Sequence, residues 1–160
     1  MLILGAFDQD GAPTVRFRVS APGGKTLEYV GIVDTGFTGF VALPLAEMVP
    51  LRLVTQPAAA SVRLGNGTIT YNLIANGTVV LLDQQRPATI LLDDTSAEAL
   101  VGMALLRAFD LALIVTDTAV VLHDRSEILE VVARFMATAP EGQPNTVVGV
   151  VRSGTESGDE

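Results

Sequence analysis

The sequence predicts a mostly β domain with a few short helices and one longer C-terminal helix. Most of the chain consists of short apolar segments, some alternating with polar residues, that are separated by clusters of Gly, Pro and Asn. This pattern is typical of strands joined by turns. Near the end of the chain, apolar residues recur at helical spacing, at Ile128, Leu129, Val131, Val132, Phe135 and Met136.

The first predicted strands lead to an aspartate. Residues 15–20 alternate between apolar and polar side chains, as in a half-buried strand. After a turn cluster at residues 21–25, residues 26–33 form the next strand and end on Asp34.

The middle of the chain combines a short helix with a hairpin. Pro44 follows a short apolar strand at residues 40–43 and suits the first position of a helix, which we expect to close before Pro50. Residues 62–71 are predicted to form a hairpin, because Asn66-Gly67 readily takes the positive φ angles of a tight turn.

The rest of the chain alternates strands with short connections before the C-terminal helix. Strands are predicted at residues 73–82, 88–92, 111–115 and 119–122, a helix at residues 105–109, and connections at residues 84–87 and 116–118. Asp124 followed by Glu127 resembles a capping box at the start of the C-terminal helix. We expect one domain over residues 1–137 and a flexible tail over residues 138–160, in which residues 147–151 could add an edge strand.

Composition narrows the classes of function. A chain of 160 residues with 49% hydrophobic and 18% charged residues fits a single packed domain. Its net charge of -8 opposes binding to a phosphate backbone, so nucleic acid is not an expected partner. The absence of cysteine excludes thiolate metal sites, and a single histidine argues against a histidine-based metal centre or a serine-type triad. We therefore expect no metal and no cofactor.

No segment has the length and composition of a membrane span. The most apolar stretch, residues 100–115, is interrupted by Arg107 and Asp110. Residues 1–8 lack the basic leader and the full apolar region of a signal peptide. We therefore expect a cytoplasmic protein without a membrane partner.

The most informative stretch is residues 31–39, G-I-V-D-T-G-F-T-G, in which an apolar strand delivers Asp34 into a sharp turn with Thr35 and Gly36. A charge at the end of a buried strand needs hydrogen bonds or a chemical task. Asp34 could simply be a turn residue that hydrogen-bonds its own backbone. If it instead belongs to a carboxylate pair, its partner must come from another copy of the chain, because the sequence holds no second D-T-G or D-S-G.

Residues 33–39 resemble the active-site signature of aspartic proteases, in which an apolar strand leads into D-[TS]-G-x-[ST]. Residues 99–106, A-L-V-G-M-A-L-L, resemble the apolar-apolar-Gly element of the same fold and its short helix. Residues 88–92 resemble the strand before that element in retroviral proteases. The order and spacing are similar to those of a single retropepsin-like unit over about residues 10–123, which implies a closed β-barrel of one lobe.

This resemblance implies a homodimeric aspartic endopeptidase that acts on peptide or protein substrates. Two carboxylates about 3 Å apart repel by roughly 5 kcal/mol at an effective dielectric constant of about 20, so an Asp34 pair across the dimer axis would share one proton. The ionised carboxyl would take a proton from water and the protonated one would donate to the scissile carbonyl oxygen. Thr35 resembles the threonine whose hydroxyl bonds across the axis, and Gly36 could supply backbone freedom.

The resemblance also assigns a substrate-covering element. Five residues occupy the place of the mobile flap, although any surface hairpin could look like this: Leu64, Gly65, Asn66, Gly67 and Thr68. Gly102 resembles the glycine of the apolar-apolar-Gly element.

Two positions depart from the retroviral pattern. Thr38 stands where those enzymes carry an acidic residue, and Met103 stands where they carry an arginine. The intact D-T-G favours the enzyme. The alternative is a non-catalytic dimeric peptide-binding or regulatory module that retains the fold and its groove. A structural scaffold with a fortuitous motif would place Asp34 away from any dimer axis.

Overall fold

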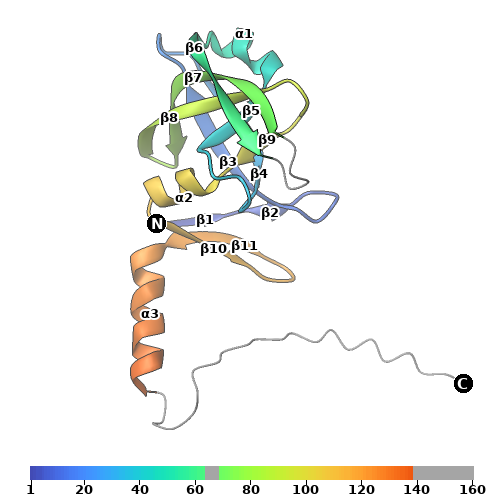
Figure 1. Cartoon of the computed structure of the whole chain (residues 1–160). Coiled ribbons are helices and arrows are strands. Elements are labelled where there is room, and N and C mark those ends of the chain that lie inside the picture. Colours follow the sequence, from blue (N-terminus) through green and yellow to red (C-terminus); the bar gives the residue numbers. More distant parts are fainter. Residues whose placement is uncertain (64–68, 139–160) are drawn as a thin grey trace, which may run out of the picture.

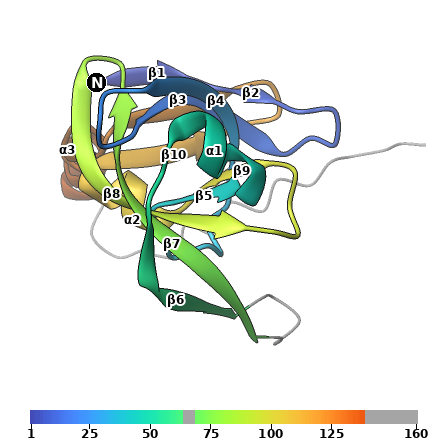
Figure 2. The same cartoon turned by 90° about the horizontal axis from the view of Figure 1, so that it is seen from above.

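The computed structural model describes residues 1–63 and 69–138, and it is mostly β as the sequence predicts (Figures 1 and 2). In chain order the elements are β1 (Leu2–Leu4), β2 (Ala6–Phe7), β3 (Pro13–Ser20), β4 (Thr26–Val33), β5 (Val41–Pro44), the 3-10 helix η1 (Leu45–Glu47), α1 (Met48–Leu51), β6 (Thr55–Arg63), β7 (Ile69–Leu81), β8 (Gln84–Asp93), β9 (Ala99–Val101), α2 (Met103–Ala108), β10 (Leu111–Val115), β11 (Val120–Asp124) and α3 (Arg125–Thr138).

The larger sheet closes on itself. Its strand order is β2-β3-β4-β9-β5-β8-β7-β6, and β3 pairs in addition with β7, with Val19 opposite Val79. This extra pairing joins β3 through β7 into a ring of strands. Alternate residues of β3 point inward, so that Val15, Phe17 and Val19 are buried in the core, as the alternation in the sequence predicts.

A second, three-stranded sheet has the order β1-β11-β10 and lies below the barrel in Figure 1. The turn between β10 and β11 is closed by a hydrogen bond of 2.9 Å from the Thr116 amide to the Ala119 carbonyl, which confirms the predicted connection at residues 116–118. Helix α3 follows β11 directly and runs away from the barrel (Figure 1).

Pro50 and Pro87 lie inside regular elements at places where the sequence predicts a boundary or a connection. The helix expected to close before Pro50 instead passes through it to Leu51, because a proline in the first turn loses no intrahelical hydrogen bond. The connection expected at residues 84–87 is also wrong, since β8 begins at Gln84 and Pro87 lies opposite Thr78 of β7. Strand β5 reaches β8 only from Ile90 onward, so Pro87 has a paired strand on one side alone.

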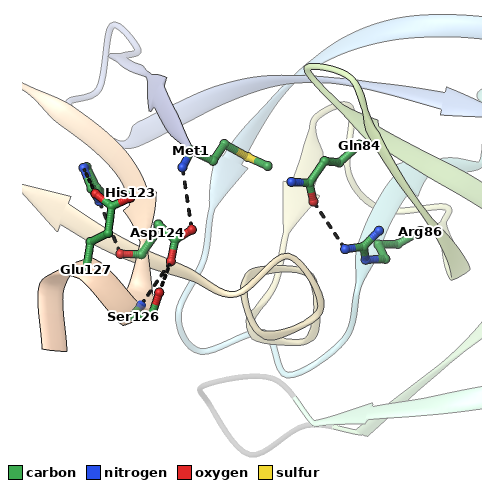
Figure 3. A network of polar contacts seen from close by, with 7 residues as sticks. All are labelled: Met1, Gln84, Arg86, His123, Asp124, Ser126 and Glu127. Atoms are coloured by element: carbon green, nitrogen blue, oxygen red, sulfur yellow. Dashed lines mark hydrogen bonds and ion pairs between the residues drawn. The ribbon is translucent and has the colours of Figure 1, made fainter. Parts of the chain in front are cut away.

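A network of polar contacts joins the first residue to the start of α3 (Figure 3). The Asp124 Oδ1 atom accepts hydrogen bonds from the Ser126 amide at 3.2 Å and the Ser126 hydroxyl at 2.6 Å. The terminal ammonium of Met1 lies 3.7 Å from Asp124 Oδ2. Glu127 does not complete the predicted capping box, because the Asp124 amide donates to the Met1 carbonyl and Glu127 lies 3.6 Å from the His123 ring.

These contacts hold the pKa of Asp124 below its usual value, chiefly through the hydrogen bond from the Ser126 side chain. We expect Ser126→Ala to lower the free energy of unfolding at neutral pH. A lowered carboxyl pKa contributes stability that is present above the unfolded pKa and is lost as pH falls through the folded pKa. The difference between Ser126→Ala and the native chain in urea unfolding should therefore shrink in acid, and an equal difference at both pH values would contradict this role.

Candidate active site

The two motifs singled out in the sequence lie side by side in the larger sheet, because strand β4 leads into the first motif and strand β9 belongs to the second. Strand β9 lies between β4 and β5, parallel to β4 and antiparallel to β5. Val33 is opposite Val101 in the β4–β9 pair, and the Asp34 amide donates to the Val101 carbonyl at 3.0 Å. The second motif thus binds the backbone at the point where β4 ends and Asp34 follows.

The turn after β4 orients the Asp34 carboxylate. The Gly36 amide donates to Asp34 Oδ1 at 2.8 Å, and the Phe37 amide donates to the Asp34 carbonyl at 3.2 Å. Asp34 is half-buried, whereas Thr35 and Gly36 are exposed. The carboxylate therefore does cap its own turn, as the simpler interpretation requires. Within residues 1–63 and 69–138, this contact engages only one of its two oxygens.

The start of α2 fixes the far end of the same turn. The amides of Gly102, Met103 and Ala104 donate to the carbonyls of Phe40, Phe37 and Gly39, at 3.0, 2.9 and 3.1 Å respectively. A Cβ atom at Gly102 would lie 2.6 Å from the Phe37 carbonyl oxygen, so only glycine allows this approach. The glycine of the apolar-apolar-Gly element is therefore a contact residue of the Asp34 turn.

Asp34 and Gly36 line a cleft of 770 Å³, a volume that falls in the range of ligand sites. Its apolar wall comes from several elements: Phe37, Phe40, Val41, Ile74, Leu91 and Leu100. Ser61, Val62 and Thr70, on the two stems of the β6–β7 hairpin, also line it. The predicted flap, residues 64–68, lies outside the described residues, and its role stays a prediction.

Sequence reasoning missed part of the cleft. Asn72 lines it from β7, and no local motif marks this residue, whereas Leu100 lines it from β9 and belongs to the second motif. The Asp93 Oδ1 atom accepts hydrogen bonds from the Thr95 amide and hydroxyl at 2.8 and 2.7 Å, so that this carboxylate caps the turn after β8. Asp93 also lines the cleft, where it and Asp34 are the ionisable side chains among the lining residues.

A smaller cavity of 330 Å³ is lined by Asp8, Tyr29, Glu47 and Glu98, and Asp34 is not among its lining residues. The Tyr29 hydroxyl donates to Glu47 at 2.7 Å, and burial together with this carboxylate raises the pKa of Tyr29. The contact ties β4 to η1 and has a structural role.

Neither a metal cluster nor a spanning helix is found in the described part of the chain. No three His, Asp or Glu side chains within residues 1–63 and 69–138 are placed to hold a metal ion. None of the described helices has the length and apolar character needed to cross a membrane.

No protein-family profile and no curated protein sequence matches this chain. Solved structures do match. A retropepsin-like aspartic protease from Rickettsia conorii superposes with a TM-score of 0.54 at 18% identity, over 76% of this chain and 90% of that one. EIAV protease, in complex with the inhibitor HBY-793, superposes with a TM-score of 0.53 at 14% identity, over 68% of this chain and 98% of that one. The chain therefore has the retropepsin-like fold of aspartic proteases.

Proposed function

We propose that this chain is an aspartic endopeptidase whose active site forms from two copies, each contributing Asp34. The observation that carries the proposal is the position of Asp34. It is half-buried at a cleft of 770 Å³, its amide donates to a carbonyl of β9, and its turn accepts hydrogen bonds from amides of α2 within a retropepsin-like fold.

The chemistry follows from placing two such carboxyls together. Repulsion keeps the pair from ionising fully, so that one carboxyl is ionised and the other keeps its proton. The ionised carboxyl removes a proton from water as that water attacks the peptide carbonyl. The protonated carboxyl donates to the carbonyl oxygen, and the leaving amine then takes a proton. This route needs neither a covalent intermediate nor a metal ion.

The substrate class follows from the shape and lining of the cleft. Apolar side chains from the turn and from β5, β7, β8 and β9 suit the apolar side chains of an extended peptide. The hydroxyl groups of Ser61 and Thr70, on the hairpin stems, suit its backbone. We therefore expect unfolded proteins and peptides, rather than folded ones, to be cleaved.

The direct test is cleavage of an unfolded protein across a range of pH. The expected rate follows a bell, because activity requires one protonated and one ionised carboxyl, and it declines toward alkaline pH as the shared proton is lost. The optimum should be acidic to near neutral, and chelators should leave the rate unchanged. A rate that keeps rising into strongly alkaline solution would contradict the carboxyl pair.

The second candidate is a non-catalytic peptide-binding module, which the altered positions Thr38 and Met103 favour. Met103 holds the turn through its backbone amide rather than through its side chain, so the turn remains formed without the arginine of the retroviral pattern. Peptide binding in the cleft without any cleavage would select this module over the enzyme.

A further inference from the structure

The cleft contains one carboxylate that the proposed chemistry does not use. Asp93 is the last residue of β8, and it lines the cleft together with Thr95. Its Oδ1 atom accepts both hydrogen bonds from Thr95, and no bond to Oδ2 is found in the described part of the chain. The turn therefore orients this carboxylate through one oxygen only.

A buried amide lies beside this carboxylate. Leu73 of β7 is paired with Leu92 of β8. Continuing this antiparallel register places Asn72 opposite Asp93, on the face of both strands that lines the cleft. Side chains at opposite positions have Cβ atoms about 4.5–5.5 Å apart. Asn72 is only 7% exposed, and its Nδ2 atom donates to the Thr70 hydroxyl at 3.4 Å, so that its Oδ1 atom is the group left to accept.

No positive charge in the described part of the protein balances Asp93. Pro44 of β5 lies on the other side of Asp93 in the sheet and offers neither a donor nor a charge. The described residues that line the cleft include no Lys, Arg or His, and the ion pairs found among the described residues do not involve Asp93. A half-buried carboxylate is stabilised by a cation within reach, and at this wall an occupant of the cleft can bring one.

We propose that Asp93 and Asn72 form a subsite for a cationic side chain, so that the preferred substrates are peptides with lysine or arginine at the position that reaches it. The inference rests on the proposed function, because it names the substrate class of the same cleft. The ammonium or guanidinium group donates to Asp93 Oδ2 and Asn72 Oδ1. Its aliphatic stem lies along Ile74 and Leu91, which form the next opposite pair on the same face.

Two other sources of a preference for cations must be separated from this subsite. The net charge of -8 attracts any cationic peptide, and Asp34 is a second carboxylate in the cleft. The first source acts on a lysine at every position of a peptide and weakens with salt, whereas a subsite acts at one position. The second source is removed in Asp34→Asn, a variant in which binding can be measured without cleavage.

The test measures peptide binding to the full chain carrying Asp34→Asn, by fluorescence anisotropy at neutral pH. Extended apolar peptides carry a single lysine at successive positions, and in the reference peptides norleucine keeps the stem without the charge. We expect lysine to tighten binding about tenfold at one position, because hydrogen bonds to charged groups are stronger than neutral ones. Adding Asp93→Asn, which keeps an oxygen for Thr95, should bring this ratio close to one. The matched control is Asp94→Asn, which removes the same charge at an exposed position outside the cleft lining and should keep the ratio.

A second variant tests the amide. Asn72→Ala should lower the ratio of lysine to norleucine binding to an intermediate value, because the carboxylate remains and its neighbouring acceptor is lost. Circular dichroism that matches the native chain shows that each variant is folded.

The outcomes separate the subsite from the proposed function. Equal binding of lysine and norleucine peptides at every position would overturn the subsite, and cleavage of both by the native chain would leave the proposed function standing. A preference for lysine that survives Asp93→Asn would overturn the subsite as well. A preference that depends on Asp93, in a native chain that cleaves none of the peptides, would uphold the subsite and select the peptide-binding module. Binding of no peptide at all would overturn the subsite, and the absence of cleavage by the native chain would then remove the proposed function too.

Discussion

Asp34→Asn should abolish peptide hydrolysis and leave the fold and self-association unchanged. Asparagine keeps the shape of the side chain, and its Oδ1 atom can still accept the 2.8 Å hydrogen bond from the Gly36 amide. It cannot ionise, so no group remains to take the proton from water. Proton transfer by a positioned side chain contributes about 10²- to 10⁴-fold to a rate, and we expect kcat/KM to fall by at least the upper end of this range.

A mixing experiment turns this variant into a test of the two-copy site. If native and Asp34→Asn chains exchange freely in equal amounts, only about a quarter of the dimers are fully native, so about a quarter of the activity should remain. A site contained in one chain would retain half. The control is Asp94→Asn, which removes one charge at an exposed position outside the cleft lining. Mixtures with this control should stay close to full activity.

Gly102→Ala should have the second largest effect. Its Cβ atom would lie 2.6 Å from the Phe37 carbonyl and equally close to the Phe37 ring. Because the carbonyl belongs to the backbone, the Asp34 turn or the start of α2 must move. Overpacking of this kind costs about 1–3 kcal/mol of stability, and displacement of the turn should remove most of the peptidase activity as well.

The comparison variant for this effect is Gly11→Ala. Gly11 has a φ of +81° and no atom within 4 Å of its virtual Cβ, so alanine there is strained but clashes with nothing. It should cost about 1–2 kcal/mol through backbone strain and keep its activity. Urea unfolding and peptide hydrolysis measured on both variants separate the two effects. Equal activity in both variants would show that the α2 contact does not position Asp34.

The elements that the sequence predicts best are those whose pattern is local. Strand β4 (Thr26–Val33) and strand β10 (Leu111–Val115) begin and end where apolar residues and turn signals place them. Strands β1 and β2 were not predicted, because three and two residues are too few to show a sequence pattern. They are strands because they pair with β11 and β3, respectively. Most of β6 also escaped, since it is an edge strand with Pro57 and a register irregularity between Thr55 and Ala59.

The candidate site also has a part that a local sequence pattern predicts and a part that depends on tertiary structure. The D-T-G turn is a local motif, and its place at the end of a strand beside a cleft follows from that motif and the strand before it. Part of the cleft wall does not, because Asn72 and Asp93 reach it from separate strands that carry no motif. These two side chains share the cleft with Asp34 only through tertiary structure, and no spacing along the chain predicts this.

The position of β9 between β4 and β5 also determines when, during synthesis and folding, the Asp34 turn can form. Gly31 pairs with Ala99, so the strand that carries Asp34 gains this neighbour only through a long-range loop closure. Closures of this kind are entropically costly and slow, and they make folding rates fall as contacts become less local. A nascent chain that ends before residue 103 has Asp34 but lacks the Met103 and Ala104 amides, which hold the far end of its turn. On our proposal, proteolytic capacity is thus withheld during synthesis, and the growing chain has no active site with which to damage its neighbours.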